Sequence, residues 1–399
     1  MYRRLEEFSR ILNLSMFSKP VFNKMQKNQL LPVIQDTWKS SRDAAIAEVK
    51  KNAVIVVGGD GRSDSPGYTA KYGSYTLMHS DGVNIHATGK IVAMNLVQVS
   101  EVKNSNHMEP EGLKRCLQDM KEKDLKMDHL ATDRHIMVSS IMRKEHPGID
   151  HQFDIWHVAK GVVKSLSNKA KTKMCSDLSP WVQSISNHLW FSCHTCNGDE
   201  KVLRERWLSI LHHITDKHEW SGNEKVHKCA HPPLSTEDRK SIKWLKKPSP
   251  AFSALQAMVT DAGLLKAMKN MTHFCHTGDL EVFHSMLLKY CPKRHHFHYD
   301  AMYGRLMLAA IDWNSSERIP RLDKDGNSTV SVVYSRRRKD FVLKGNYVRK
   351  KQGRRKDFVL GLSWQHKHSS GRCKVTVEHK PHSHQSVLVS RKEMSSSIF

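Results

Sequence analysis

The chain has 399 residues, and its 64 Lys and Arg against 40 Asp and Glu give a formal net charge of +24. The sequence has no run of about 18 apolar residues, which excludes a membrane-spanning helix, and acidic residues near the N-terminus disfavour a secretory signal peptide. Eight cysteines are too few for a disulfide scaffold and favour reduced thiols. The excess positive charge predicts a polyanionic partner, most simply nucleic acid.

The N-terminal residues 1–51 are expected to form a helical segment. Leu5, Phe8 and Ile11 recur at helical spacing. Ser40 and Ser41 precede an Ala-, Glu- and Lys-rich run, which predicts a solvated helix over residues 43–51.

The next part of the chain, residues 52–159, alternates strand and helix patterns. Residues 53–57 are a continuous apolar run that ends in Gly58-Gly59-Asp60-Gly61, which predicts a buried strand stopped by glycines. Further strands are expected at residues 72–78, 90–99, 129–133 and 151–154, with helices at 109–123, from about 134 and from about 157. Three strands, a helix, a strand, a helix and a strand is the order of an RNase H-like α/β domain.

The rest of the chain divides into three parts. Residues 160–275 show long helical patterns and predict a large all-helical insertion, with one helix expected over residues 176–191. Helical patterns at 279–289 and 298–313 predict that residues 276–330 supply the C-terminal helices of the core. The predicted fold is therefore an RNase H-like mixed α/β sheet flanked by helices, followed by a basic tail over residues 331–399.

The tail carries much of the positive charge. It holds 17 Lys and Arg against 4 acids, and the sequence Arg-Arg-Lys-Asp-Phe-Val-Leu occurs twice in it, at residues 337–343 and 354–360. Each copy is either one strand of a basic β-hairpin or a local duplication in a loosely ordered tail, and the end of the chain is expected to be disordered. The candidate DNA-contacting side chains are the basic residues that lead into the two copies: Arg336, Arg337, Arg338, Lys339, Arg354, Arg355 and Lys356.

Three acids are candidates for metal-dependent chemistry. Asp60 follows the first predicted strand among glycines, Asp133 closes a second strand, and Glu281 lies on a later helix. In an RNase H-like sheet the two strands are neighbours, so the carboxylates would share a site that Mg²⁺ or Mn²⁺ could occupy. The alternatives are ordinary ones: an Asp after a strand is often a turn or helix cap, and most helical glutamates are solvated.

Several motifs carry a resemblance to a known family. Gly59-Asp60-Gly-Arg-Ser-Asp-Ser-Pro-Gly67, Thr132-Asp133-Arg134-His135 and Phe153-Asp154-Ile-Trp156-His157 resemble the transposases of Kolobok-type DNA transposons. That group is related to the hAT, Mutator and P groups, which share an RNase H-like core, and the resemblance runs from about residue 20 to about residue 350. It implies a DDE triad of Asp60, Asp133 and Glu281 that binds the catalytic metals.

The related groups also carry a Cys or Asp, two residues and a His downstream of the second acid, and Asp154-Ile-Trp-His157 matches that pattern. The resemblance implies that Asp154 and His157 orient the site or contact DNA phosphate. Read from the residues alone, Asp154 is a helix N-cap and His157 a packed histidine.

Two sets of residues have the spacing of zinc ligands. Cys193-His-Thr-Cys196 could join Cys229-Ala-His231, or His213 and His218 could join that second pair in a tetrahedral site. Five residues turn a helix by about 140°, so His218 is expected at or beyond a helix end. The resemblance favours the set of His213, His218, Cys229 and His231 for a structural Zn²⁺, and the alternative is ordinary surface histidines.

Three functions remain open on the sequence. The first is a nuclear transposase acting on double-stranded DNA, with homodimerisation expected by analogy. The second is an inactive, domesticated DNA-binding protein, because residues 1–52 contain no Cys or His for the N-terminal zinc module that such transposases carry. The third, an exonuclease, is disfavoured because Arg62 stands where such enzymes place a second acid.

Overall fold

The computed structural model describes residues 2–79, 89–275 and 277–316, together with four short strands between residues 318 and 349. The chain forms two compact units. The first comprises Met1–Leu130, Ser140–Ile149 and the described residues from Thr277 onward, and the second comprises Ala131–Ser139 and the described residues of Asp150–His276. No helix in the described part of the chain has the length and apolarity to cross a bilayer.

The N-terminal segment is helical as predicted, with α1 (Tyr2–Ile11), α2 (Lys19–Met25) and α3 (Leu31–Val49). The helix expected over residues 43–51 is partly buried rather than solvated, and it is the last part of α3, which runs through both serines without a break. Its buried side chains share one face at spacings of three and four residues, so burial along the whole stripe outweighs the weak helix propensity of serine: Ile34, Trp38, Ala45, Ile46 and Val49.

The first strand differs from its prediction. β1 covers Val56–Ser63, so Asp60 lies within the strand and the glycines do not end it. The glycines serve close packing: a Cβ added at Gly59 would lie 2.7 Å from the Tyr75 hydroxyl, and one added at Gly61 would lie 2.8 Å from Cγ of Glu109. Glycine inside a strand permits such an approach at some cost in backbone entropy.

The first five strands form one mixed sheet in the order β3-β2-β1-β4-β5. β1, β2 (Tyr72–His79) and β3 (Ile91–Gln98) are antiparallel neighbours, with Asp60 opposite Thr76, and β4 (His129–Thr132) and β5 (Asp150–Phe153) follow. The predicted α/β class, a mixed sheet flanked by helices, is confirmed at this level.

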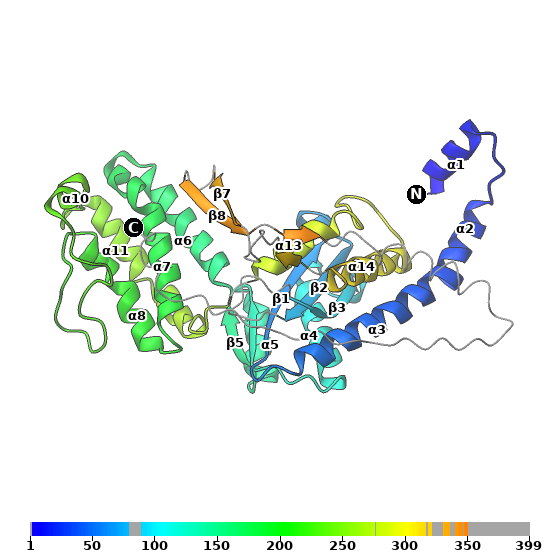
Figure 1. Ribbon diagram of the computed structural model, residues 1–399, viewed down its shortest axis with the longest axis horizontal. Helices are drawn as coiled ribbons and strands as arrows, with labels where there is room; N and C mark the ends of the chain where they lie inside the picture. Colours follow the sequence, from blue (N-terminus) through cyan, green and yellow to red (C-terminus); the bar gives the residue numbers. More distant parts are fainter. Residues whose placement is uncertain are drawn as a thin grey trace, which may run out of the picture. The chain divides into compact units, whose positions relative to one another are not determined.

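Helices cover both faces of the sheet in the first unit, as Figure 1 shows for β1 to β3. Met94 and Leu96 of β3 belong to the hydrophobic cluster with α3 and α14 (Tyr299–Asn314), whereas Asn95 on the other face donates to Asp119 of α4 (Met108–Glu122) at 2.9 Å. α13 (Gly278–Leu287) belongs to the same hydrophobic cluster through Leu280 and Phe283. Three short 3₁₀ turns also belong to this unit: η2 (Gly67–Thr69), η3 (Val99–Glu101) and η4 (Ser105–His107). α5 (Ile136–Glu145) is divided between the two units after Ser139.

The second unit is helical around a core of its own. α6 (Ile155–Ala170) packs on α7 (Val182–Thr195), and α7 on α8 (Glu200–Leu208) (Figure 1). The remaining helices are η5 (Lys173–Trp181), α9 (Ile210–His213), α10 (Thr236–Ser241), α11 (Pro250–Val259), α12 (Ala262–Ala267) and η6 (Met268–Asn270). Strand pairing among its described residues after β5 is limited to one bridge, Glu219 with Lys228.

The single helix predicted over residues 176–191 is two elements. η5 is a 3₁₀ helix that contains Pro180, and the α-helix α7 starts only at Val182. Proline has no N–H to donate and clashes with the preceding turn, which explains why the α-helix begins after it.

The basic tail is described only in part. β7 (Val330–Ser335) pairs with β8 (Asp340–Gly345), and β6 (Arg318–Pro320) pairs with β9 (Tyr347–Arg349). β8 therefore starts within the first copy of the repeated sequence. The predicted DNA-contacting residues lie outside the described residues: Arg336, Arg337, Arg338, Lys339, Arg354, Arg355 and Lys356.

Candidate functional site

In the first unit, Asp60 of β1 lies against helix α13. Its Oδ2 is 3.2 Å from Nδ1 of His284, and the two side chains are only 17% and 13% exposed. The helix approaches the strand closely at Gly58, where an added Cβ would lie 3.3 Å from Cδ1 of Leu280. Gly58, two residues before Asp60, thus lets α13 pack onto β1.

Glu281 lies on the same helix, three residues before His284. Residues at that spacing share one face of an α-helix, with Cβ atoms about 5–6 Å apart. Leu280 and Phe283 are fully buried and anchor α13, while Glu281 is exposed. The structure therefore brings the helix that carries the third predicted acid to the strand that carries the first.

In the second unit, His157 lies between two carboxylates. Its Nδ1 is 2.7 Å from Oδ1 of Asp133, the residue that follows β4, and 2.8 Å from Oδ2 of Asp154. Asp154 also caps α6, because its Oδ1 accepts a hydrogen bond from the N–H of Trp156 at 2.8 Å. The helix N-cap expected from the residues alone is therefore confirmed, and the same side chain also contacts His157.

The two carboxylates control the charge of His157. Burial alone would lower the pKa of His157, but the hydrogen bonds and negative charges of Asp133 and Asp154 raise it to about 10. The ring is therefore an imidazolium at neutral pH and compensates the two acids. Asp154 is 1% exposed, and its two oxygens serve the helix cap and His157, so we assign it the role of positioning His157.

Asp133, Asp154 and His157 form a group of side chains that could hold a metal ion, with ligand atoms all within 4.8 Å of one another. Carboxylate oxygens suit hard cations such as Mg²⁺ and Mn²⁺. Of the three predicted acids, Asp60 and Glu281 belong to the first unit and Asp133 to the second.

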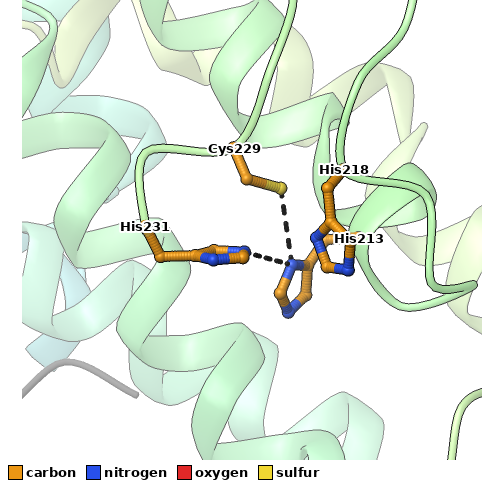
Figure 2. Close-up of side chains that lie close together, drawn as sticks. All are labelled: His213, His218, Cys229 and His231. Carbon is orange, nitrogen blue, oxygen red and sulfur yellow. Dashed lines mark hydrogen bonds between the residues drawn. The ribbon is translucent and has the colours of Figure 1, made fainter. Parts of the chain in front are cut away.

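The second unit also contains the histidine-and-cysteine set predicted from spacing. His213, His218, Cys229 and His231 form another group that could hold a metal ion, and Figure 2 shows the four side chains converging. His213 is the last residue of α9, so His218 lies beyond a helix end, as the 140° argument predicted.

The alternative pair, Cys193 and Cys196, does not join this group. Both thiols are buried, and that of Cys196 donates to the carbonyls of Cys193 and Thr272 at 3.2 and 3.3 Å. Burial raises the pKa of the Cys193 thiol, which disfavours the thiolate that a metal requires. The seven cysteines in the described part of the chain are all free thiols.

Sequence reasoning missed two features of these sites. The first is His284, although its position three residues after Glu281 could have indicated a shared face. The second is a cation–π contact at the start of α6, where Nζ of Lys160 lies 4.2 Å from the ring centre of Trp156. The i, i+4 spacing of these two residues in the sequence was its only signal.

Comparison with protein-family models and with curated proteins finds no match to the chain. The resemblance to Kolobok-type transposases therefore rests on the sequence motifs themselves.

Proposed function

We propose that the chain is a metal-dependent, transposase-like enzyme that cuts phosphodiester bonds in double-stranded DNA and joins ends by transesterification, with Asp60, Asp133 and Glu281 as its metal ligands. The observation that carries the proposal is the packing of α13 on β1. It brings Asp60 and the helix of Glu281 together from distant parts of the sequence.

The sheet supports the same proposal. Its elements follow one another as three strands, a helix, a strand, a helix and a strand, which is the chain order of an RNase H-like domain. β4 is the neighbour of β1 in the sheet, and Asp133 follows β4 directly. Acids on two adjacent strands and one helix are the arrangement that the DDE resemblance implies.

The residues around the acids fit the task of holding divalent cations. A bound Mg²⁺ or Mn²⁺ pair would activate the attacking hydroxyl and stabilise the leaving oxygen at phosphorus. His284 engages one carboxylate oxygen of Asp60, and His157 fixes Asp133 while its own orientation is set by Asp154. The histidines thus restrain two of the three acids, and the positive charge of His157 compensates that of Asp133 in the absence of a metal.

The charge of the chain supports DNA as the partner. Seventeen Lys and Arg lie after residue 330, and the chain as a whole carries +24. Lys and Arg side chains contact DNA phosphates regardless of the base sequence, and the affinity that these contacts provide falls steeply with salt concentration. A nuclear location and action as a homodimer belong to the same proposal, by analogy with the resembling transposases.

The test is nicking of supercoiled plasmid by the full chain in Mg²⁺ or Mn²⁺. We expect the wild type to nick, and Asp60→Asn, Asp133→Asn and Glu281→Gln to lose about 100-fold or more in rate, since removing a metal ligand weakens transition-state stabilisation by several kcal/mol. Asp279→Asn is the matched control, because Asp279 lies in the same first turn of α13 as Glu281 and is not one of the three proposed metal ligands.

Equal nicking by the wild type and the three acid variants would overturn the proposal. If every version is inactive yet binds DNA tightly and in a salt-sensitive way, the chain is the inactive DNA-binding protein instead.

A further inference from the structure

We infer that His213, His218, Cys229 and His231 bind one Zn²⁺ in a closed tetrahedral site that stabilises the helical unit. The inference concerns different residues from the proposed function and does not depend on it. It rests on the spacing of the ligand atoms, on the contacts of the outer ring nitrogens and on the local fold.

Two distances between the side-chain atoms are those of a zinc coordination sphere. Zn–N bonds of about 2.0–2.1 Å and a Zn–S bond of about 2.3 Å at tetrahedral angles separate two nitrogens by about 3.3–3.4 Å, and nitrogen from sulfur by about 3.5–3.6 Å. Nδ1 of His213 lies 3.3 Å from Nε2 of His231 and 3.5 Å from Sγ of Cys229. All four ligand atoms lie within 4.8 Å of one another (Figure 2).

Hydrogen bonding alone accounts poorly for this convergence. An imidazole nitrogen carries either one proton or one lone pair, yet Nδ1 of His213 has both a thiol and a ring nitrogen as neighbours. The 3.3 Å between the two ring nitrogens is also longer than the usual range for a hydrogen bond donated by an N–H group. A cation at the centre accepts all the lone pairs at once.

The outer nitrogens of two of the histidines are held by acceptors, as zinc-binding histidines require. Nε2 of His218 lies 3.1 Å from Oδ1 of Asp216, and Nδ1 of His231 lies 2.7 Å from the carbonyl oxygen of Pro232. These contacts place the ring protons on the outer atoms. They leave Nδ1 of His218 and Nε2 of His231 as lone-pair donors for a metal.

Two further details fit this assignment. Nδ1 of His218 is a buried atom without a hydrogen-bond partner among the described residues, which is costly unless a ligand satisfies it. Asp216 is itself held by Arg239, whose Nε donates to the same Oδ1 at 2.8 Å. The carboxylate that orients His218 is therefore fixed in turn.

The local backbone brings the ligands together from a short stretch of chain. His213 ends α9, and the loop after it folds back on itself: the N–H of Cys229 donates to the carbonyl of His218 at 2.8 Å, and Glu219 bridges Lys228. Trp220 and Val226 are the buried apolar side chains of this loop between His218 and Cys229. So small a core gives a loop little stability, and a metal is one of the usual substitutes.

The ligand chemistry favours Zn²⁺ over a hard cation. Three imidazoles and one thiolate suit a borderline-soft ion, whereas Mg²⁺ and Ca²⁺ prefer oxygen. Four protein ligands complete a tetrahedron and leave no open position for a substrate or water. The site is therefore structural and has no part in catalysis.

Metal analysis of the full chain, expressed in zinc-supplemented medium and dialysed without chelator, tests the inference. We expect about one zinc per chain in the wild type and at most about a tenth of that in Cys229→Ala and His231→Ala. His227→Ala and Cys193→Ala are the matched controls, because His227 is an exposed neighbour on the same loop and Cys193 belongs to the rejected pair. Both controls should keep the metal.

A second measurement keeps the test independent of variants that fail to fold. After chelation, Co²⁺ added to the wild-type chain should give the intense visible absorption of tetrahedral cobalt, together with a thiolate-to-cobalt charge-transfer band, and Zn²⁺ should abolish both. A wild-type chain that binds neither ion overturns the inference. So does zinc that is lost in Cys193→Ala and retained in Cys229→Ala.

Discussion

Two histidine clusters in the helical unit differ in a way that explains what each can bind. His157 lies between Asp133 and Asp154, whose charges overcome burial and raise its pKa to about 10. Burial, followed by the charges of the neighbouring histidines, lowers the pKa of His213 to about 3. The same side chain is a cation in one cluster and a neutral lone-pair donor in the other, because of its burial and of the charges beside it.

The contrast extends to metals. The cluster of Asp133, Asp154 and His157 is rich in oxygen, and a hard divalent ion would compete there with a proton. The cluster of His213, His218, Cys229 and His231 has no carboxylate among its ligands and suits zinc. Under the proposed function the first cluster serves chemistry, and under the inferred zinc site the second serves stability.

The largest expected effect is on stability, from removal of zinc. Chelation of the full chain should lower its thermal midpoint by about 10 °C, because a structural zinc contributes several kcal/mol and each kcal/mol is worth about 2–4 °C in a unit of this size. Differential scanning calorimetry with and without chelator measures the shift. The thermal midpoint of Cys229→Ser should be low before chelation and should change little when the chelator is added. A drop in that variant equal to that of the wild type would contradict the assignment.

A smaller effect separates two helix caps. Asp154 caps α6, and Asp199 caps α8 by accepting from the N–H groups of Lys201 and Val202. Loss of the cap should cost Asp154→Ala and Asp199→Ala about 1 kcal/mol of unfolding free energy each, to which Asp154→Ala adds the loss of its contact with His157. Only Asp154→Ala should also slow plasmid nicking, since it alone releases His157. Asp154→Asn retains the cap oxygen and should show the loss of activity with less loss of stability. Parallel behaviour of the two alanine variants in both assays would show that Asp154 is a cap and nothing more.

The last two effects concern pH and should have opposite signs. The folded pKa of His157 lies above its unfolded value of about 6.5, so its contribution to stability is complete below that pH and is lost as the pH rises toward about 10. His188, whose Nε2 lies 2.6 Å from the carbonyl oxygen of Arg206, has a pKa that burial lowers to about 4. Its contribution is complete above about 6.5 and is lost as the pH falls toward 4.

Thermal midpoints between pH 4 and pH 10, measured without added Mg²⁺, test both signs. His157→Gln should flatten the curve on the alkaline side, and His188→Gln should flatten it on the acid side. If the two variants change the same side of the curve, the charge states assigned to the two histidines are wrong.

Much of the fold could be predicted from periodicity. The strands expected at residues 72–78 and 90–99 are β2 and β3 to within a residue or two, and the expected helices at 109–123 and 279–289 are α4 and α13. These elements have long apolar patterns with a single period, and tertiary contacts do not change the helix or strand that such a pattern predicts.

The errors have specific physical reasons. Glycines both stop strands and allow close packing inside them, and only the positions of Tyr75 and Glu109 show that Gly59 and Gly61 do the second. The break before α7 follows from Pro180, which the apolar pattern around it concealed.

The sites were predictable as residue types but not as contacts. Spacing indicated that His218 lies past a helix end, but which nitrogen each histidine presents depends on Asp216 and Pro232. The pairing of Asp60 with His284 joins distant segments, and no local pattern reports such a contact.

The central claim is that Asp60, Asp133 and Glu281 hold divalent cations, and iron-directed cleavage of the polypeptide tests it most directly. Fe²⁺ bound in place of Mg²⁺ generates hydroxyl radicals in the presence of ascorbate and peroxide, and these cut the backbone close to the ion. Mass spectrometry of the DNA-bound, zinc-loaded chain should find cuts around residues 60, 133 and 281, all suppressed by excess Mg²⁺ and absent from Asp60→Asn. Cuts that avoid these three segments, or that persist unchanged in Asp60→Asn, would contradict the account.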